Sequence, residues 1–128
     1  MISLKNLEKI YIVDKNINST FLDLPSDLNK FYQICNGIMG DIEGETSLTI
    51  YPKQFLEVRN NDYEIPEYLP NFIMIGDDGG GIAILMKKSD QIIYASGMGT
   101  LDEISTIEIA SNLETFLITN KGSLENYY

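Results

Sequence analysis

The chain has 128 residues, of which nine are Lys or Arg and nineteen are Asp or Glu, so its formal net charge is −10. This length allows one domain with a sizeable core and is too short for two ordinary domains, so we expect a single domain over residues 1–128. The negative charge repels phosphate backbones and anionic lipid, which disfavours nucleic acid and membrane surfaces as partners. It would attract a basic protein, although solubility alone also explains an acidic chain.

The sequence contains no histidine, and this limits the kinds of catalytic and metal-binding sites that the chain can form. Histidine is the most common acid or base near neutral pH and the most common metal ligand. Ser-His-Asp, Cys-His and zinc sites are therefore excluded within this chain, and we expect no cofactor and no metal. The single cysteine, Cys35, excludes an internal disulfide, and we expect it to be buried in packing.

The sequence shows no run near the roughly 18 apolar residues of a membrane span, and its start, MISLKNLEKI, lacks the pattern of a signal peptide. We therefore expect a cytoplasmic protein.

The first residues of the chain predict a helix capped by Ser3, with one apolar face. That face consists of Leu4, Leu7, Ile10 and Tyr11, although the run IYIV also fits a strand.

The clearest helix of the sequence lies in LPSDLNKFYQICNG. Pro25 suits a first turn, and Asp27 places negative charge at the positive end of the helix dipole. The apolar residues at positions i, i+3, i+4 and i+7 are Leu28, Phe31, Tyr32 and Cys35. This spacing predicts one buried stripe, and Gly37 should end the helix in a left-handed turn.

Residues 38–45 are rich in glycine and acids, with Asp41, Glu43 and Glu45 at alternate positions. In an extended chain these three carboxylates would share one side. We favour a solvated loop or an edge strand that charge protects from pairing, with a binding face as the alternative.

Residues 46–51 alternate as a strand, with Leu48 and Ile50 on one face. Pro52 then opens a short predicted helix. The apolar positions of that helix are Phe55, Leu56 and Val58. Residues 62–70 contain two prolines and no helical stripe, so we expect an irregular crossing there.

The stretch NFIMIGDDGGGIAIL, residues 71–85, organises the rest of the prediction. Two apolar runs, Phe72–Ile75 and Ile82–Met86, flank two acids and four glycines. Such a pattern predicts a β-hairpin, because glycine readily adopts the positive φ angles of the return. A strand whose successive residues are all apolar needs cover on both faces, so the hairpin should be central in its sheet.

The remainder continues this sheet and closes with a helix. Ile92–Ser96 is predicted as a third strand of an antiparallel meander, and Ile104–Ile109 as an edge strand. Ser111 to Glu114 forms a capping-box pattern before a helix that ends at Gly122. The buried side of that helix should be Leu113, Phe116 and Leu117, and the aromatic tail Tyr127 and Tyr128 either docks or hangs free.

The order of these elements resembles the SUKH superfamily of Smi/Knr-like domains. The resemblance rests on LPSDLNKFYQICNG, a strand with a short helix, FIMIGDDGGGIAIL and the SNLETFL helix, from about Leu24 to Leu117. It implies an α+β fold in which a mostly antiparallel sheet is covered by helices, and it implies binding rather than catalysis. Bacterial members are immunity proteins that bind a cognate toxin, often a nuclease, and fungal members regulate cell-wall synthesis.

The resemblance and the charge together predict a non-catalytic protein that binds a basic toxin domain, as a monomer or weak homo-oligomer. An acidic inhibitor can imitate the phosphates that a nuclease grips. The contact residues we expect are Asp77, Asp78, Glu43, Glu45, Tyr94 and Tyr63. Asp77 and Asp78 also suit a purely local role as turn residues that bond their own backbone, and Tyr94 suits filling of the sheet face.

Other functions of the glycine loop fit less well. A phosphate-binding loop needs a following helix and a Gly-Lys-Ser/Thr ending, whereas Gly81 leads into a predicted strand. A calcium loop needs a glutamate at its twelfth position, where counting from Asp77 gives Lys88. The alternatives that remain are an interaction module regulating an endogenous protein, such as cell-envelope machinery, and a small-molecule binder.

Overall fold

The computed structural model describes residues 24–42, 46–124 and 127. The helix predicted near Ser3 lies outside these residues, as do Glu43, Glu45 and Tyr128. The described part is an α+β domain with one antiparallel sheet of six strands in the order β1-β2-β3-β4-β5-β6. This confirms the predicted fold class, and the meander runs through all six strands.

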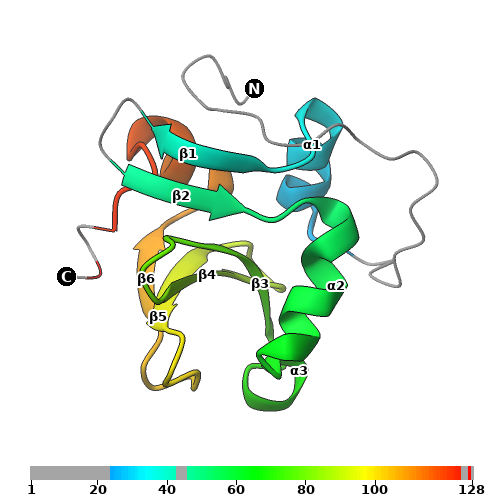
Figure 1. Cartoon of the computed structure of the whole chain (residues 1–128), viewed down its shortest axis with the longest axis vertical. Helices are drawn as coiled ribbons and strands as arrows, with labels where there is room; N and C mark the ends of the chain where they lie inside the picture. Colours follow the sequence, from blue (N-terminus) through cyan, green and yellow to red (C-terminus); the bar gives the residue numbers. More distant parts are fainter. Residues whose placement is uncertain (1–23, 43–45, 125–126, 128) are drawn as a thin grey trace.

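The strands are β1 (Ile38–Ile42), β2 (Thr46–Ile50), β3 (Phe72–Asp77), β4 (Ile82–Lys87), β5 (Ile93–Gly97) and β6 (Ile107–Ala110). The helices are α1 (Ser26–Ile34), α2 (Lys53–Asp62), the single turn α3 (Ile65–Tyr68) and the π-helix η1 (Thr115–Thr119). In Figure 1 the β1–β2 pair runs across the direction of the later strands, and α2 and α3 follow each other along β3.

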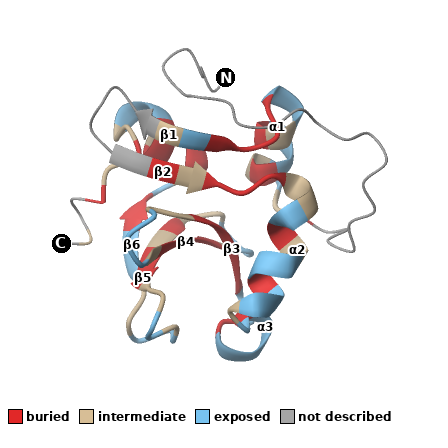
Figure 2. Cartoon of the chain, in the orientation of Figure 1, coloured by how far each residue is buried: buried red, intermediate tan, exposed pale blue. Residues whose placement is uncertain are grey.

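The predicted hairpin is confirmed as β3 and β4, the two middle strands of the sheet. Successive residues Phe72–Ile75 and Ala83–Met86 are buried, so both faces of these strands are covered (Figure 2). Gly79 and Gly81 in the connecting loop have positive φ angles, as the return of the chain requires. The apolar runs therefore form the middle of the core, where removing their side chains from water stabilises the fold most.

Helix α1 packs as the sequence predicted, with Leu28 and Phe31 fully buried. Its N-terminus is closed by a residue far away in sequence, because Gln91 Oε1 accepts hydrogen bonds from Asp27 N at 2.6 Å and from Ser26 Oγ at 3.0 Å. Gly37 follows the helix at φ +101°, and a Cβ there would lie 2.7 Å from Ile50 O. Glycine is needed at this position both for its backbone angle and for the close approach of β2.

The sheet edges also agree with the prediction, since β1 and β6 are the two outer strands. The last strand begins at Ile107, three residues later than predicted, and Ile104 is exposed in the loop before it. Leu113, Phe116 and Leu117 are buried under the sheet as expected. The ring of Tyr127 is half-buried against the core, so this part of the tail docks.

Two local predictions were wrong. Residues 62–70 are not an irregular crossing throughout, because Ile65–Tyr68 forms one helical turn after Glu64 takes a left-handed conformation with φ +56°. The cap of the last helix is Asn112 rather than Ser111, since Asn112 Oδ1 accepts a hydrogen bond from Thr115 N at 2.7 Å. Serine and asparagine cap helices about equally well, so the sequence pattern alone could not separate the two registers.

Candidate functional site

The candidate functional surface lies where α2 passes the ends of β2 and β3. Asn60, buried on α2, fixes this crossing by pairing its amide with the backbone of one strand residue. Its Oδ1 accepts a hydrogen bond from Met74 N at 2.8 Å, and its Nδ2 donates to Met74 O at 2.9 Å. Because β2 aligns with β3 only at Thr49–Asp77 and Ile50–Gly76, the Asn60 side chain supplies the bonds that a neighbouring strand would otherwise make.

A second polar contact joins the end of β2 to the glycine loop. The hydroxyl of Tyr51 donates to Asp77 Oδ2 at 2.5 Å, and the other oxygen of Asp77 accepts from Gly79 N at 2.8 Å. Burial, followed by the hydrogen bond and the negative charge of Asp77, raises the pKa of Tyr51 far above its ordinary value. Tyr51 therefore stays protonated as a hydrogen-bond donor, which is the opposite of the lowered pKa that a catalytic tyrosine base needs.

Arg59 of α2 covers the ring of Tyr51, with the guanidinium carbon 5.6 Å from the ring centroid. A cation over an aromatic face is attracted by the ring quadrupole, which holds the long arginine side chain against the protein surface. Arg59 and Tyr51 line a shallow hollow of about 210 Å³ together with Asp77. The hollow is therefore lined by the basic group of Arg59 and by the Asp77 carboxylate, which already accepts hydrogen bonds from Tyr51 and Gly79.

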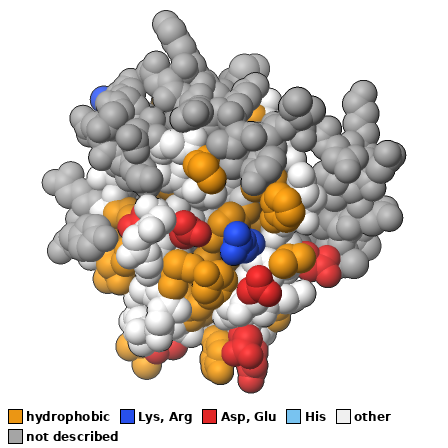
Figure 3. Space-filling model, viewed as in Figure 1, with side chains coloured by type: hydrophobic (Ala, Val, Ile, Leu, Met, Phe, Trp, Pro, Cys, Tyr) orange, Lys and Arg blue, Asp and Glu red, His pale blue; other side chains and the backbone are white. Residues whose placement is uncertain are grey.

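Met39 and Phe55 line this hollow with exposed apolar side chains, and Val58 follows Phe55 by three residues on α2. Met39 is 48% exposed, Phe55 42% and Val58 54%. Met39 lies across from Thr49, which in turn lies across from Asp77, so these three residues form a row across three strands. We name as the Tyr51 surface the set Met39, Thr49, Tyr51, Phe55, Val58, Arg59 and Asp77. Figure 3 shows hydrophobic side chains around the basic group near the centre of this face, with acidic side chains beside them.

The two predicted loop acids are held within their own turn, which was one of the two predicted alternatives. Asp78 Oδ1 accepts hydrogen bonds from Gly80 N at 2.8 Å and from Ile82 N at 3.0 Å. Asp77 is bound to Gly79 and Tyr51 as described above. Contact of either acid with a partner stays a prediction.

The other predicted contact residues are spread over the molecule. Tyr94 of β5 packs edge-on against Phe72, with ring centroids 5.2 Å apart, and so fills the sheet face. Tyr63 lies at the end of α2 and is half-buried beside a different hollow, which it lines together with Tyr68. Glu43 and Glu45 lie outside the described residues. Of the four predicted contact residues that the structure describes, Asp77 alone lies in the Tyr51 surface.

The sequence prediction missed Arg59, Met39 and the exposure of α2. The signal was present in the helix pattern, because Phe55, Val58 and Arg59 are spaced i, i+3 and i+4 and so share a face. Leu56 and Asn60 are also four residues apart and form the buried face instead. A buried asparagine was not expected at that position, so the apolar positions of this helix could not be assigned to one side.

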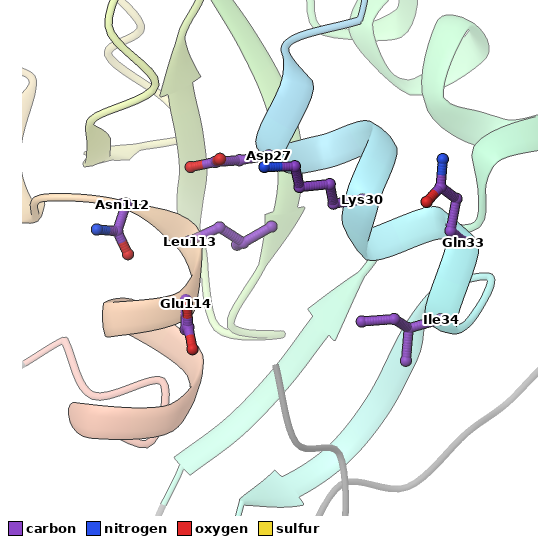
Figure 4. Close-up of a pocket in the computed structure, with 7 residues that line it drawn as sticks. All are labelled: Asp27, Lys30, Gln33, Ile34, Asn112, Leu113 and Glu114. Carbon is purple, nitrogen blue, oxygen red and sulfur yellow. The ribbon is translucent and has the colours of Figure 1, made fainter. Parts of the chain in front are cut away.

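The structure also has a larger hollow of about 440 Å³ between α1 and η1 (Figure 4). Its lining includes Asp27 and Lys30 from α1, with Leu113 and Glu114 on the facing segment. The Asn112 oxygen at its rim is used to cap η1. The charged groups that line this hollow are of both signs, with Asp27 and Lys30 on one side and Glu114 on the other. We therefore do not assign a small-molecule site to this hollow.

Metal binding and membrane spanning find no support in the described ranges. No group of three or more His, Cys, Asp or Glu side chains there could hold a metal ion. No helix among these residues has the length and apolar character needed to cross a bilayer.

No curated protein matches the sequence significantly. The SMI1 / KNR4 family (SUKH-1) matches over residues 16–119, which is most of the chain and includes α1, the whole sheet and η1. The elements on which the sequence resemblance was based all lie within this match. The chain therefore belongs to the SMI1 / KNR4 (SUKH-1) family.

Proposed function

We propose that this chain is an immunity protein that neutralises a basic, nuclease-type toxin domain by binding it through the Tyr51 surface. Members of its family are commonly immunity proteins and are generally non-catalytic. The observation that carries the proposal is the exposure of Met39, Phe55 and Val58 around the Tyr51–Arg59 pair.

The composition of this surface supports protein binding. Aromatic residues, methionine and arginine are enriched in the centres of protein interfaces, and a few such residues carry most of the binding energy. Arg59 is held on the Tyr51 ring before any partner arrives, so less conformational entropy is lost on binding. The Asn60–Met74 bonds fix α2 on β3 and keep the surface in one arrangement.

The charge of the whole chain supports a basic partner. A formal charge of −10 produces a long-range field that speeds encounter with a cationic domain. Apolar contacts at the Tyr51 surface then supply the short-range affinity. This division of roles explains why an acidic inhibitor can have an arginine near the centre of its contact surface.

The test is capture of candidate toxins by the purified full chain. Nuclease-type domains encoded by neighbouring genes are mixed with it, and complex formation is measured by isothermal titration at rising salt. We expect one-to-one binding that weakens as salt rises, because ions screen the steering charges. An unrelated acidic protein of similar net charge is the control for binding by charge alone. Failure to bind any nuclease-type domain, or equal binding by the control protein, contradicts the proposal.

A further inference from the structure

The hollow lined by Tyr63 and Tyr68 lies at the far end of α2, away from the Tyr51 surface. It has a volume of about 470 Å³ and is formed by two segments distant in sequence, the junction of α2 with α3 and the loop between β5 and β6. Both segments lie at the same end of the molecule, at the bottom of Figure 1. We name this hollow the end pocket.

The end pocket combines carboxylates with aromatic rings. Asp62 and Glu64 line it from the helix junction, and Asp102 lines it from the opposite loop. Tyr63 and Tyr68 add two phenol rings, and no lysine or arginine is among its lining residues. Tyr68 is 52% exposed, so its ring is accessible to a ligand in this pocket.

The walls of the end pocket are fixed before any ligand binds. In the loop, Met98 N donates to Gly81 O at 2.8 Å, and Asp102 Oδ1 accepts from Ser105 N at 2.7 Å. At the helix junction, Tyr68 N donates to Glu64 O at 3.0 Å. The nearby charges of Glu64 and Glu67 raise the pKa of the Tyr68 phenol, which is a sign of negative potential at this ring.

A cation is the chemistry that such a pocket fits. An aromatic face attracts a guanidinium or ammonium group, and carboxylates around it add charge-assisted hydrogen bonds. The half-buried side chains Met98 and Leu101 would contact the apolar stem of a long basic residue. We infer that the end pocket receives a lysine or arginine side chain of the partner protein, separately from the Tyr51 surface. This inference depends on the proposed function in one respect, which is that the partner is a basic protein.

The experiment titrates the ¹⁵N-labelled full chain with the peptide acetyl-Gly-Arg-Gly-amide and follows amide chemical shifts. We expect saturable shifts centred on Tyr63, Tyr68 and Leu101. The matched peptide with citrulline in place of arginine keeps the shape without the charge, and it should bind at least about fivefold more weakly.

Two variants locate the binding. Tyr68→Ala removes an exposed ring, and Glu64→Gln removes one charge while keeping the side-chain shape. Each should weaken arginine-peptide binding by about three- to tenfold. Ile107→Ala, which removes an exposed side chain of β6 outside both surfaces, is the control and should leave the affinity unchanged. Unchanged amide spectra of the variants far from the substitution show that the fold is kept.

Three results would overturn the end pocket as a cation site: shifts spread over other acidic surfaces, equal binding of the citrulline peptide, or affinity unaffected by both variants. Absence of saturable shifts at the highest soluble peptide concentration would do the same. These outcomes are separable from the fate of the proposed function. A chain that captures a nuclease-type domain but ignores the peptide refutes the pocket alone, whereas peptide binding without toxin capture refutes the proposed function alone.

Discussion

The two halves of the sheet are held together by different means. Strands β3, β4 and β5 are joined by backbone ladders of five aligned residue pairs on each side of β4, with one register shift in β3 between Met74 and Gly76. Strand β2 meets β3 at only two aligned pairs, followed by one backbone bond from Tyr51 N to Ile75 O at 2.9 Å, and side chains supply other bonds in this region. Tyr51 bonds to Asp77 beside the junction, Asn60 joins α2 to Met74 of β3, and Asn36 Oδ1 accepts a hydrogen bond from Lys53 N at the start of α2.

This difference shows where the sequence is most constrained. In the β3–β5 half, many buried apolar side chains and backbone hydrogen bonds together stabilise the fold. A side-chain substitution there keeps the backbone bonds, so it destabilises mainly through lost packing. In the half that contains α2 and the Tyr51 surface, single polar residues have no substitute. The proposed binding surface therefore depends on the contacts of β2 and α2 with β3, which a few polar residues make. Substitutions of these residues test whether the two halves of the sheet are stabilised differently.

The largest effect on stability is expected at Gly76, where β2 crosses closest to β3. A Cβ at this position would lie 2.0 Å from Thr49 O, and this atom is backbone that cannot rotate away. Gly76→Ala should lower the free energy of unfolding by about 3–5 kcal/mol, measured by urea denaturation. Gly99→Ala, whose added methyl meets nothing within 4 Å, is the control and should change stability by less than about 0.5 kcal/mol. Equal stability of the two variants would show that the junction is looser than described.

A smaller loss is expected from Asn60→Ala. The substitution leaves Met74 N and Met74 O buried without their side-chain partner, at a cost of about 2–4 kcal/mol in unfolding free energy. Asn61→Ala, at the exposed neighbouring position, should change stability by less than about 0.5 kcal/mol. If the two alanine variants unfold at the same urea concentration, the Asn60 amide does not hold α2 on the sheet.

Tyr51→Phe should cost less, about 1 kcal/mol at neutral pH, because it removes one hydrogen bond and keeps the ring under Arg59. The pKa of Tyr51 is raised in the folded state, so its stabilising effect is complete below the unfolded value of 10.0 and is lost as pH rises above that value. The variant should therefore lose less stability than the native chain between neutral pH and pH above 10.0.

The control for this measurement is Tyr94→Phe, which keeps the ring that packs on Phe72. This control should follow the alkaline stability profile of the native chain. A Tyr51→Phe profile that also follows the native chain would contradict the role given to the Tyr51 hydroxyl.

Much of the fold could be predicted from the sequence because its signals are local. The hairpin was marked by two apolar runs around glycines, and α1 by the spacing of Leu28 and Phe31. The junction could not be predicted, because Asn60 pairs with Met74 and Gln91 caps α1 only once the chain is folded. No spacing rule links residues that meet by tertiary packing.

The candidate site was less predictable than the fold for a related reason. Asp77 and Asp78 were predicted as partner contacts because they are acids in a loop. The backbone N–H groups of the glycines that follow them are closer, and the carboxylates accept hydrogen bonds from Gly79 N and Gly80 N within the turn. The exposure of Phe55 and Val58 depends on which side of α2 faces β3, and a buried asparagine decides that side. Hydrophobicity alone leaves the buried side of such a helix undecided, because Leu56 is buried while Phe55 and Val58 are exposed.

The smallest effect on stability, and the most direct test of the central claim, belongs to the Tyr51 surface itself. The double variant Phe55→Ser/Val58→Ser changes only exposed side chains, so its unfolding free energy should shift by less than about 1 kcal/mol. Its affinity for the captured nuclease-type domain, measured by isothermal titration, should fall at least about thirtyfold, as expected when central apolar contacts are removed. Ile107→Ser, at a similarly exposed position on β6, should bind like the native chain. Native affinity of the double variant, or an equal loss with Ile107→Ser, would contradict the assignment of binding to the Tyr51 surface.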